Sequence, residues 1–205
     1  RITKTWNSYP SVTIHDIQFV PHDSLVAADG LQNSVTRRWS LQASPMVHID
    51  STGAVIRGDT VVVTALVVVP SAADPPHAGL SYTQHGWTLL IHDLTTSNEW
   101  TGGLVRVGAD ACSTCPDTAQ ARLDGFNAVE RGDIIQITVT VEEFPALSMN
   151  SVTQLRPVPG DSIKLISSGN PIPRPTLIAV DDIYQGTFPN GTVRYSTAEQ
   201  YESGL

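Results

Sequence analysis

The stretch TVVVTALVVV at residues 60–69 limits the fold of this chain more than any other feature. It is rich in β-branched residues and ends at Pro70, which predicts a buried strand. Both faces of this strand are apolar, as expected where a strand bends and contributes to two sheets. The run is well short of the ~18 apolar residues that a membrane-spanning helix needs. The sequence therefore predicts no membrane span.

A second long strand is predicted after Asp133, where apolar and polar residues alternate. The alternating set consists of Ile135, Ile137, Val139 and Val141 on one side and Gln136, Thr138, Thr140 and Glu142 on the other. Successive side chains of a strand point to opposite faces of the sheet. One face of this strand is therefore expected to be buried and the other to be in contact with water.

The tripeptide Arg-Gly-Asp stands before both long strands, at residues 57–59 and 131–133. Glycine permits a turn with positive φ, and the aspartate can accept hydrogen bonds from nearby backbone N–H groups. We therefore interpret both tripeptides as turns at strand entrances. The alternative, a cell-adhesion ligand, requires a tripeptide that is exposed at a flexible tip.

The remaining elements are short. Strands are predicted over residues 11–20, 86–93 and 102–108, with one or two more between residues 149 and 169. Ala119, Leu123 and Phe126 fall at helical spacing, which predicts one short helix within residues 117–129, with Asp117 as its cap. Five strands with a helix between the third and the fourth is the order of the OB-fold, although the pattern alone indicates only a small β-barrel or sandwich.

Residues 129–155, VERGDIIQITVTVEEFPALSMNSVTQL, and residues 167–183, SSGNPIPRPTLIAVDDI, resemble the OB-fold modules of large bacterial secreted and cell-surface proteins. Such modules occur beside extracellular nuclease domains. The matching positions are Gly132, Asp133, Glu143, Thr153, Gln154, Leu155 and residues 169–173. The resemblance covers roughly residues 10–182 and leaves 21–55 unexplained. Ala65 and Thr140 stand where the family strand usually has glycine.

This resemblance implies an all-β fold: a five-stranded OB-like Greek-key barrel with one short helix, an N-terminal strand and loop extension, and a C-terminal hairpin. We expect the extension at residues 1–55 to pack on a barrel formed by residues 56–168. Residues 169–205 would then form a Pro-rich exit and a hairpin, with Asn190-Gly191 as its turn. Asn190 also fits the Asn-x-Thr glycosylation pattern. The final residues, 196–205, resemble the start of a further module.

The two cysteines of the chain, Cys112 and Cys115, are separated by two residues. We interpret the pair as a local disulfide that closes a loop, which is typical of an oxidising, extracellular compartment. The alternative is a metal or redox role for the pair. The resemblance also implies a secreted or cell-surface location.

We find no catalytic set in the sequence. The densest run of potential ligands is HDIQFVPHD, with His15, Asp16, His22 and Asp23. On a strand, however, neighbouring side chains point to opposite faces and do not converge. None of the common hydrolase, phosphate-loop or metalloprotease motifs occurs. The sequence therefore predicts a non-enzymatic protein without a metal or a cofactor.

The first functional hypothesis is a secreted structural module, on the cell surface or in an extracellular polymer. Twelve basic residues against twenty acidic ones give a net charge of −8, which works against non-specific binding of polyanions. The expected partners are copies of the chain itself or neighbouring modules, bound through exposed strands. The candidate contact residues are Ile14, Ile17, Phe19, Tyr195, Tyr201 and Leu205.

The alternative hypothesis is a ligand-binding OB module that is accessory to a secreted nuclease. Its ligand would be single-stranded nucleic acid or a glycan, bound on the face of the second and third strands. The candidate residues are Tyr82, Trp87, His92, Trp100 and Arg106. A competing interpretation makes Trp87 and Trp100 anchors of the core or of a loop.

Overall fold

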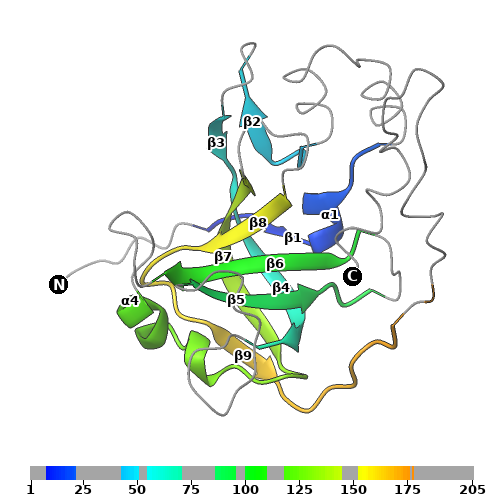
Figure 1. The fold of residues 1–205 in the computed structure, drawn as a ribbon, viewed down its shortest axis with the longest axis vertical. Helices are drawn as coiled ribbons and strands as arrows, with labels where there is room; N and C mark the ends of the chain where they lie inside the picture. Colours follow the sequence, from blue (N-terminus) through cyan, green and yellow to red (C-terminus); the bar gives the residue numbers. More distant parts are fainter. Residues whose placement is uncertain are drawn as a thin grey trace.

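The computed structural model describes residues 8–21, 43–50, 55–70, 86–95, 100–109, 118–144, 152–175 and 177. These residues form mostly β-sheet with a few short helices (Figure 1), which confirms the predicted all-β class. The strands are β1 (Ser11–Val12), β2 (Val47–Ile49), β3 (Val55–Gly58), β4 (Thr60–Val69), β5 (Gly86–His92), β6 (Gly102–Ala109), β7 (Ile134–Phe144), β8 (Val152–Pro157) and β9 (Lys164–Ser167). The helices are α1 (Ile14–Gln18), α4 (Thr118–Leu123) and the 3₁₀ helix η1 (Phe126–Ala128).

Seven of the strands form one sheet in the order β1-β4-β5-β6-β8-β7-β9, and β4 also pairs with β7. The β1–β4 and β6–β8 pairs are parallel, and the other pairs are antiparallel. Strands β2 and β3 form a separate antiparallel pair, which lies at the upper end of the molecule in Figure 1.

The two predicted long strands, β4 and β7, lie side by side from the Thr60–Thr140 pair to the Leu66–Ile134 pair. The predicted alternation in β7 is confirmed for its apolar residues, since all four are buried, but Thr138 of the polar set is buried as well. Near the end of β4, Leu66 and Val67 are both buried, because the strand changes partner there from β7 to β5. An irregularity in the register accompanies this change, as is common where a strand bends.

The predicted strand at residues 11–20 ends after Val12, and the rest of this prediction is wrong. Thr13 and Asp16 form a capping box: the Asp16 N–H donates to the Thr13 hydroxyl (3.0 Å), and the Thr13 N–H donates to the Asp16 carboxylate (2.9 Å). Such a box favours a helix start. The backbone hydrogen bond from Thr13, followed by that from its hydroxyl, lowers the pKa of Asp16 below 3.8.

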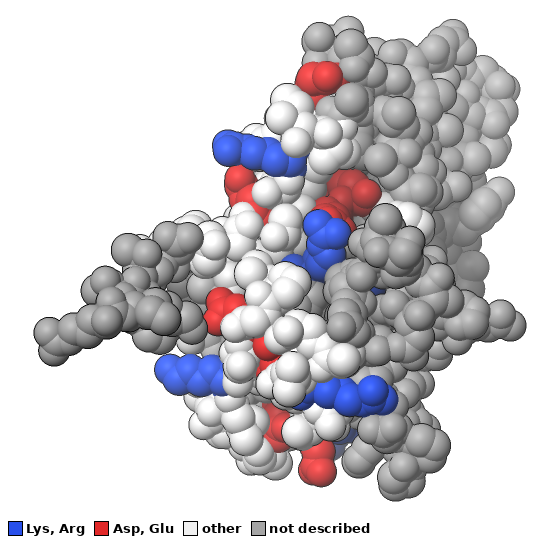
Figure 2. Space-filling model, turned by 90° about the vertical axis from the view of Figure 1, so that its left-hand side faces the viewer, with Lys and Arg blue, Asp and Glu red and all other residues white. Residues whose placement is uncertain are grey.

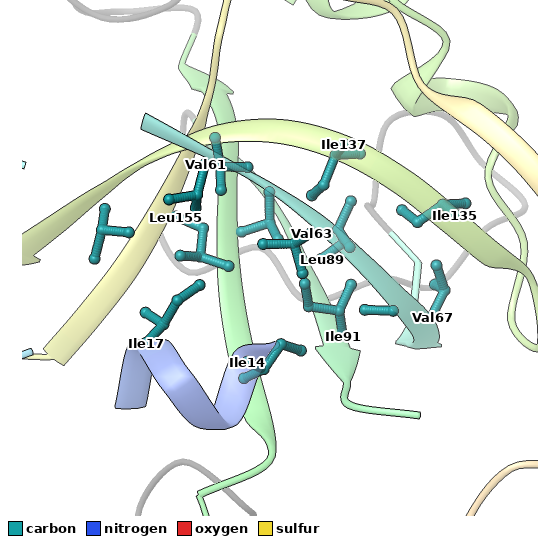
Figure 3. Close-up of a cluster of buried hydrophobic side chains, with 14 of the residues drawn as sticks. Ile14, Ile17, Val61, Val63, Val67, Leu89, Ile91, Ile135, Ile137 and Leu155 are labelled. Carbon is teal, nitrogen blue, oxygen red and sulfur yellow. The ribbon is translucent and has the colours of Figure 1, made fainter. Parts of the chain in front are cut away.

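Helix α1 contributes to the same core as the sheet. Ile14 and Ile17 lie one helical turn apart and are buried. They point from α1 into the cluster that contains Val63, Leu89 and Ile91 (Figure 3). Gly103 of β6 permits this approach, because a side-chain carbon there would contact Ile14, Ile91 and Leu155.

The predicted single helix within residues 117–129 is two short helices in the structure, α4 and η1. Gly125 separates them with a φ of 93°. Phe126 is buried as the helical spacing suggests, whereas Leu123 is largely exposed. The break turns the second part of the segment toward the core, because a left-handed residue cannot continue an α-helix.

The Arg-Gly-Asp at residues 131–133 is a turn at the entrance of β7, as predicted. Gly132 has a φ of 91°, and its N–H donates to the Val67 carbonyl at 3.0 Å. The buried Asp133 carboxylate accepts the Glu130 N–H at 2.9 Å.

For residues 57–59 the prediction of a positive-φ turn is wrong. Gly58 belongs to β3 and its φ lies outside the left-handed region. A side-chain carbon at Gly58 would overlap the Val141 carbonyl oxygen. Asp59 then links the strands, because its N–H donates to Met46 (2.9 Å) and its carbonyl accepts from Val141 (3.0 Å). Glycine is needed here for the close approach of β3 to β7.

Candidate functional site

The hairpin of β5 and β6 presents one face to the core, and its other, outward face is half-buried except at Thr88, which is buried. Thr88 pairs with Arg106, Leu90 with Leu104, and His92 with Gly102. The intervening residues Leu89, Ile91, Gly103 and Val105 are buried. Because side chains alternate along a strand, the predicted site residues His92 and Arg106 both lie on the outward face.

The predicted site residues do not form one cluster. His92 and Arg106 are separated by four positions along the hairpin register, which corresponds to about 13 Å. Trp87 pairs with Gly108 through its backbone, and its side chain is outside the described part of the structure. Tyr82 also lies outside the described residues.

His92 is held at the end of β5 by both ring nitrogens. Its Nδ1 lies 2.6 Å from the Asp93 carbonyl oxygen, and its Nε2 lies 3.1 Å from the Thr101 hydroxyl. A carbonyl can only accept, so the Nδ1 N–H donates to Asp93, and the Thr101 hydroxyl is the hydrogen-bond partner of Nε2. These bonds fix the imidazole in place within the hairpin.

Trp100 packs against the segment that follows α1. It is only 7% exposed, and it has a φ of 60°, which is rare for a bulky residue. Its ring meets Phe19 edge-on at 5.8 Å, and Phe19 stacks on His15 at 5.0 Å. Most of the Trp100 surface is therefore used to hold the β5–β6 connection against α1, as the anchor interpretation expected.

Arg106 lies beside an aromatic residue that the sequence analysis missed. The guanidinium carbon of Arg106 is 5.7 Å from the centre of the Phe144 ring. Phe144, at the end of β7, pairs with Val152 at the start of β8, and these side chains are 47% and 48% exposed. The alternation of β7, continued two residues beyond Glu142, would have placed Phe144 on the outward face.

Three polar residues lie next to the Arg106–Phe144 contact in the strand register: Glu142, Gln154 and Arg156. Gln154 pairs with Leu104 on one side and with Glu142 on the other. Arg156 forms an ion pair with Glu142 (2.6 Å), and the buried Gln154 amide lies 3.4 Å from the same carboxylate. The Glu142 carboxylate thus holds both neighbouring polar side chains.

We call this group the Arg106 surface. It consists of Arg106, Glu142, Phe144, Val152, Gln154 and Arg156. It combines a half-exposed aromatic ring, an aliphatic side chain and planar polar groups on adjacent strands. Such a mixture can bind a ligand that has one apolar face and several hydrogen-bonding groups.

The candidate contact residues for assembly lie in different environments. Ile14 and Ile17 are buried in the core, whereas Phe19 is partly exposed. Tyr195, Tyr201 and Leu205 lie outside the described residues, as do the predicted disulfide residues Cys112 and Cys115.

Charged side chains are dispersed over the face drawn in Figure 2. Lysine and arginine residues stand singly or close to Asp and Glu, without a continuous basic area in the described part of this face. Within the described residues, no three His, Cys, Asp or Glu side chains gather as a metal site would require. None of the helices described is long and apolar enough to cross a membrane.

Comparisons of the chain with protein-family models, with curated proteins and with solved structures gave no match.

Proposed function

We propose that this chain is a secreted, non-enzymatic binding module with an OB-like barrel, and that its Arg106 surface binds an oligosaccharide. The main support for this proposal is the position of the Arg106 guanidinium beside the half-exposed Phe144 ring. The Glu142–Arg156 ion pair lies next to it. The proposal adopts the second of the two sequence hypotheses and keeps the first as a further candidate.

Strand pairing supports the barrel. Strands β4, β5, β6, β8 and β7 each pair with two others of this set, and the β4–β7 pair joins its two ends. Helix α4 lies between the third and the fourth of these strands in the sequence. This order and the parallel β6–β8 pair agree with a five-stranded Greek-key barrel of the OB type.

The position of the Arg106 surface supports ligand binding. It lies on β6, β8 and β7, and it extends along β8 from Val152, which pairs with Phe144, to Arg156, which pairs with Thr140. OB-folds bind oligonucleotides and oligosaccharides on the face of their second and third strands with flanking loops, and Arg106 lies on the third of these strands, β6. Rigid strands also hold the aromatic ring and the polar groups at fixed spacing, which lowers the entropic cost of binding.

Charge favours a saccharide over a nucleic acid. The chain has a net charge of −8, and the Glu142 carboxylate neutralises Arg156 within the surface itself. Single-stranded nucleic acid usually needs a positively charged groove along its backbone. A sugar ring needs instead an apolar face to lie against and planar donors and acceptors for its hydroxyl groups.

A titration with three probes tests this function: a chito-oligosaccharide, an oligogalacturonide and oligothymidylate. We expect at least one saccharide to bind, and Phe144→Ala to weaken this binding at least tenfold. Leu123→Ala, which removes an exposed leucine of α4, should leave the binding unchanged.

Two results would contradict the saccharide proposal. One is binding of neither saccharide. The other is tight oligothymidylate binding that falls steeply with salt, because this dependence is the signature of phosphate contacts.

Assembly is the second candidate function. It is favoured by β9, which pairs only with β7 among the described residues and carries exposed apolar side chains. Exposed strand edges of this kind recruit further strands.

Secretion is proposed from the resemblance of residues 129–155 and 167–183 and from the Cys112/Cys115 spacing. Intact mass with and without reductant tests the disulfide.

A further inference from the structure

After β9 the chain continues through a segment in which every second residue is a proline. Residues 170–175 read Asn-Pro-Ile-Pro-Arg-Pro, so each of them is either a proline or the residue before one. Proline fixes its own φ at about −65°, and the residue before a proline is confined to extended or polyproline II conformations. The backbone of the whole segment is thus restricted by its own sequence. We call residues 170–175 the Pro arm.

The base of the Pro arm is fastened to the turn that precedes β7. The Asn170 N–H donates to the Gly132 carbonyl at 2.9 Å. The side-chain amide of Asn170 donates to the same carbonyl and to the Ser167 hydroxyl, both at 2.9 Å. Gly169 has a φ of 70°, which turns the chain between β9 and this contact. The arm therefore starts at a fixed position and in a fixed direction.

Beyond its base the Pro arm is largely exposed. Ile172 is half-buried, whereas Arg174 and the three prolines are exposed. Figure 1 shows the arm, in orange, running out from the lower end of the molecule after β9. It belongs to no helix or strand, and its prolines have no N–H for strand pairing. The extended form of the arm therefore comes from its sequence and its fastened base more than from packing.

We propose that the Pro arm is a semi-rigid spacer that holds the chain after Pro175 at a set distance and direction from the sheet. A polyproline II chain rises about 3.1 Å per residue, so the arm spans about 15 Å from Asn170 to Pro175. Pro-rich segments stay extended over several residues, whereas Gly-rich segments of the same length behave as random coils. The fully exposed Leu177 shows that the chain still stands apart from the sheet just after the arm.

The base of the arm is remote from the Arg106 surface. Gly132 stands two residues before the start of β7, whereas Phe144 is the last residue of that strand. Strand β7 has 11 residues, which corresponds to about 35 Å. The spacer therefore does not depend on the proposed saccharide site, and the two can be tested separately.

A distance measurement by pulsed electron paramagnetic resonance tests the proposal. In a background with Cys112→Ser and Cys115→Ser, spin labels are attached through Leu123→Cys and Leu177→Cys, because both leucines are exposed. We expect a single narrow distribution of distances between the two labels. Replacing all three prolines of the arm with glycine should at least double the width of this distribution, because the segment then becomes flexible.

Three further variants identify the source of the rigidity. Pro173→Gly alone should broaden the distribution by less than the triple replacement. Asn170→Ala removes the side-chain bonds at the base and leaves the prolines, so it should shift the mean distance. Pro159→Gly, which changes an exposed proline between β8 and β9, should leave the distribution unchanged. Circular dichroism establishes that each variant is folded.

Two results would overturn the proposal. One is a distribution in the parent chain that is as broad as that of the triple-glycine variant. The other is a narrow distribution that persists in both the triple-glycine variant and Pro173→Gly, because contacts other than the prolines would then hold the arm extended.

Discussion

The two Arg-Gly-Asp tripeptides share their sequence but differ in structure. At residues 131–133, Gly132 adopts a left-handed φ and begins a turn before β7. At residues 57–59, Gly58 lies within β3 and lets the backbone pass close to Val141. The first case needs glycine for its backbone freedom and the second for its lack of a side chain. Neighbouring strands, more than the tripeptide itself, decide which property is used.

Gly58→Ala should have the largest effect on stability. The new carbon would overlap the Val141 carbonyl oxygen, and a strand backbone cannot move aside without breaking its pairing. We expect a loss of about 3 kcal/mol of unfolding free energy, measured by urea denaturation. A loss of unfolding free energy below about 1 kcal/mol would mean that β3 does not pack closely against β7 at Gly58.

Gly132→Ala should lower the unfolding free energy by less, about 2 kcal/mol. The new side chain would stand at a left-handed φ, and its first carbon would lie 2.9 Å from the Asn170 carbonyl oxygen. Gly160→Ala is the matched control, since Gly160 has a φ of 81° and nothing within 4 Å of the added carbon. This control should lose only about 1 kcal/mol. Equal losses in both variants would show that the Asn170 contact relaxes freely.

The two aspartates extend the comparison. Asp133 is buried and accepts the Glu130 N–H, so Asp133→Ala should cost about 1.5 kcal/mol. Asp59 is partly exposed and meets His48 at 2.9 Å, so Asp59→Ala should cost only about 0.5 kcal/mol. Urea denaturation of both variants measures this order, and the reverse order would refute it.

The smallest expected effect concerns Asp16, a carboxylate that caps a helix instead of preceding a strand. Its pKa in the folded state is lowered from 3.8, so the ionised form stabilises the fold above this pH. That contribution is lost as the pH falls through the folded-state pKa. Asp16→Asn should therefore flatten the acid side of the stability profile slightly between about pH 5 and pH 2. An unchanged profile would argue against the capping box.

The sequence predicts the strands of this molecule better than its connections. The alternation in β7 and the apolar run of β4 follow from burial on a pleated surface, which leaves a periodic signal in the sequence. The strand expected beyond Val12 is a helix, because the Thr13–Asp16 capping box and the spacing of Ile14 and Ile17 outweigh strand propensity. Both signals can be recognised in the sequence when the apolar residues of this segment are compared with the 3.6-residue period of a helix.

The candidate site was less predictable. Arg106 was identified from its strand, but its aromatic neighbour Phe144 comes from the far end of β7. Their meeting depends on the parallel β6–β8 pairing, which no local pattern indicates. The burial of Trp100 against Phe19 likewise depends on where α1 docks, so aromatic composition alone could not distinguish an anchor from a ligand platform.

Chemical-shift mapping of a saccharide titration on isotope-labelled protein tests the central claim most directly. We predict perturbations that cluster at Arg106, Glu142, Phe144 and residues 152–156, and that disappear in Phe144→Ala. Perturbations centred on His15, Phe19 and Trp100, or on β9, would contradict it, as would a spectrum that does not change with any saccharide probe.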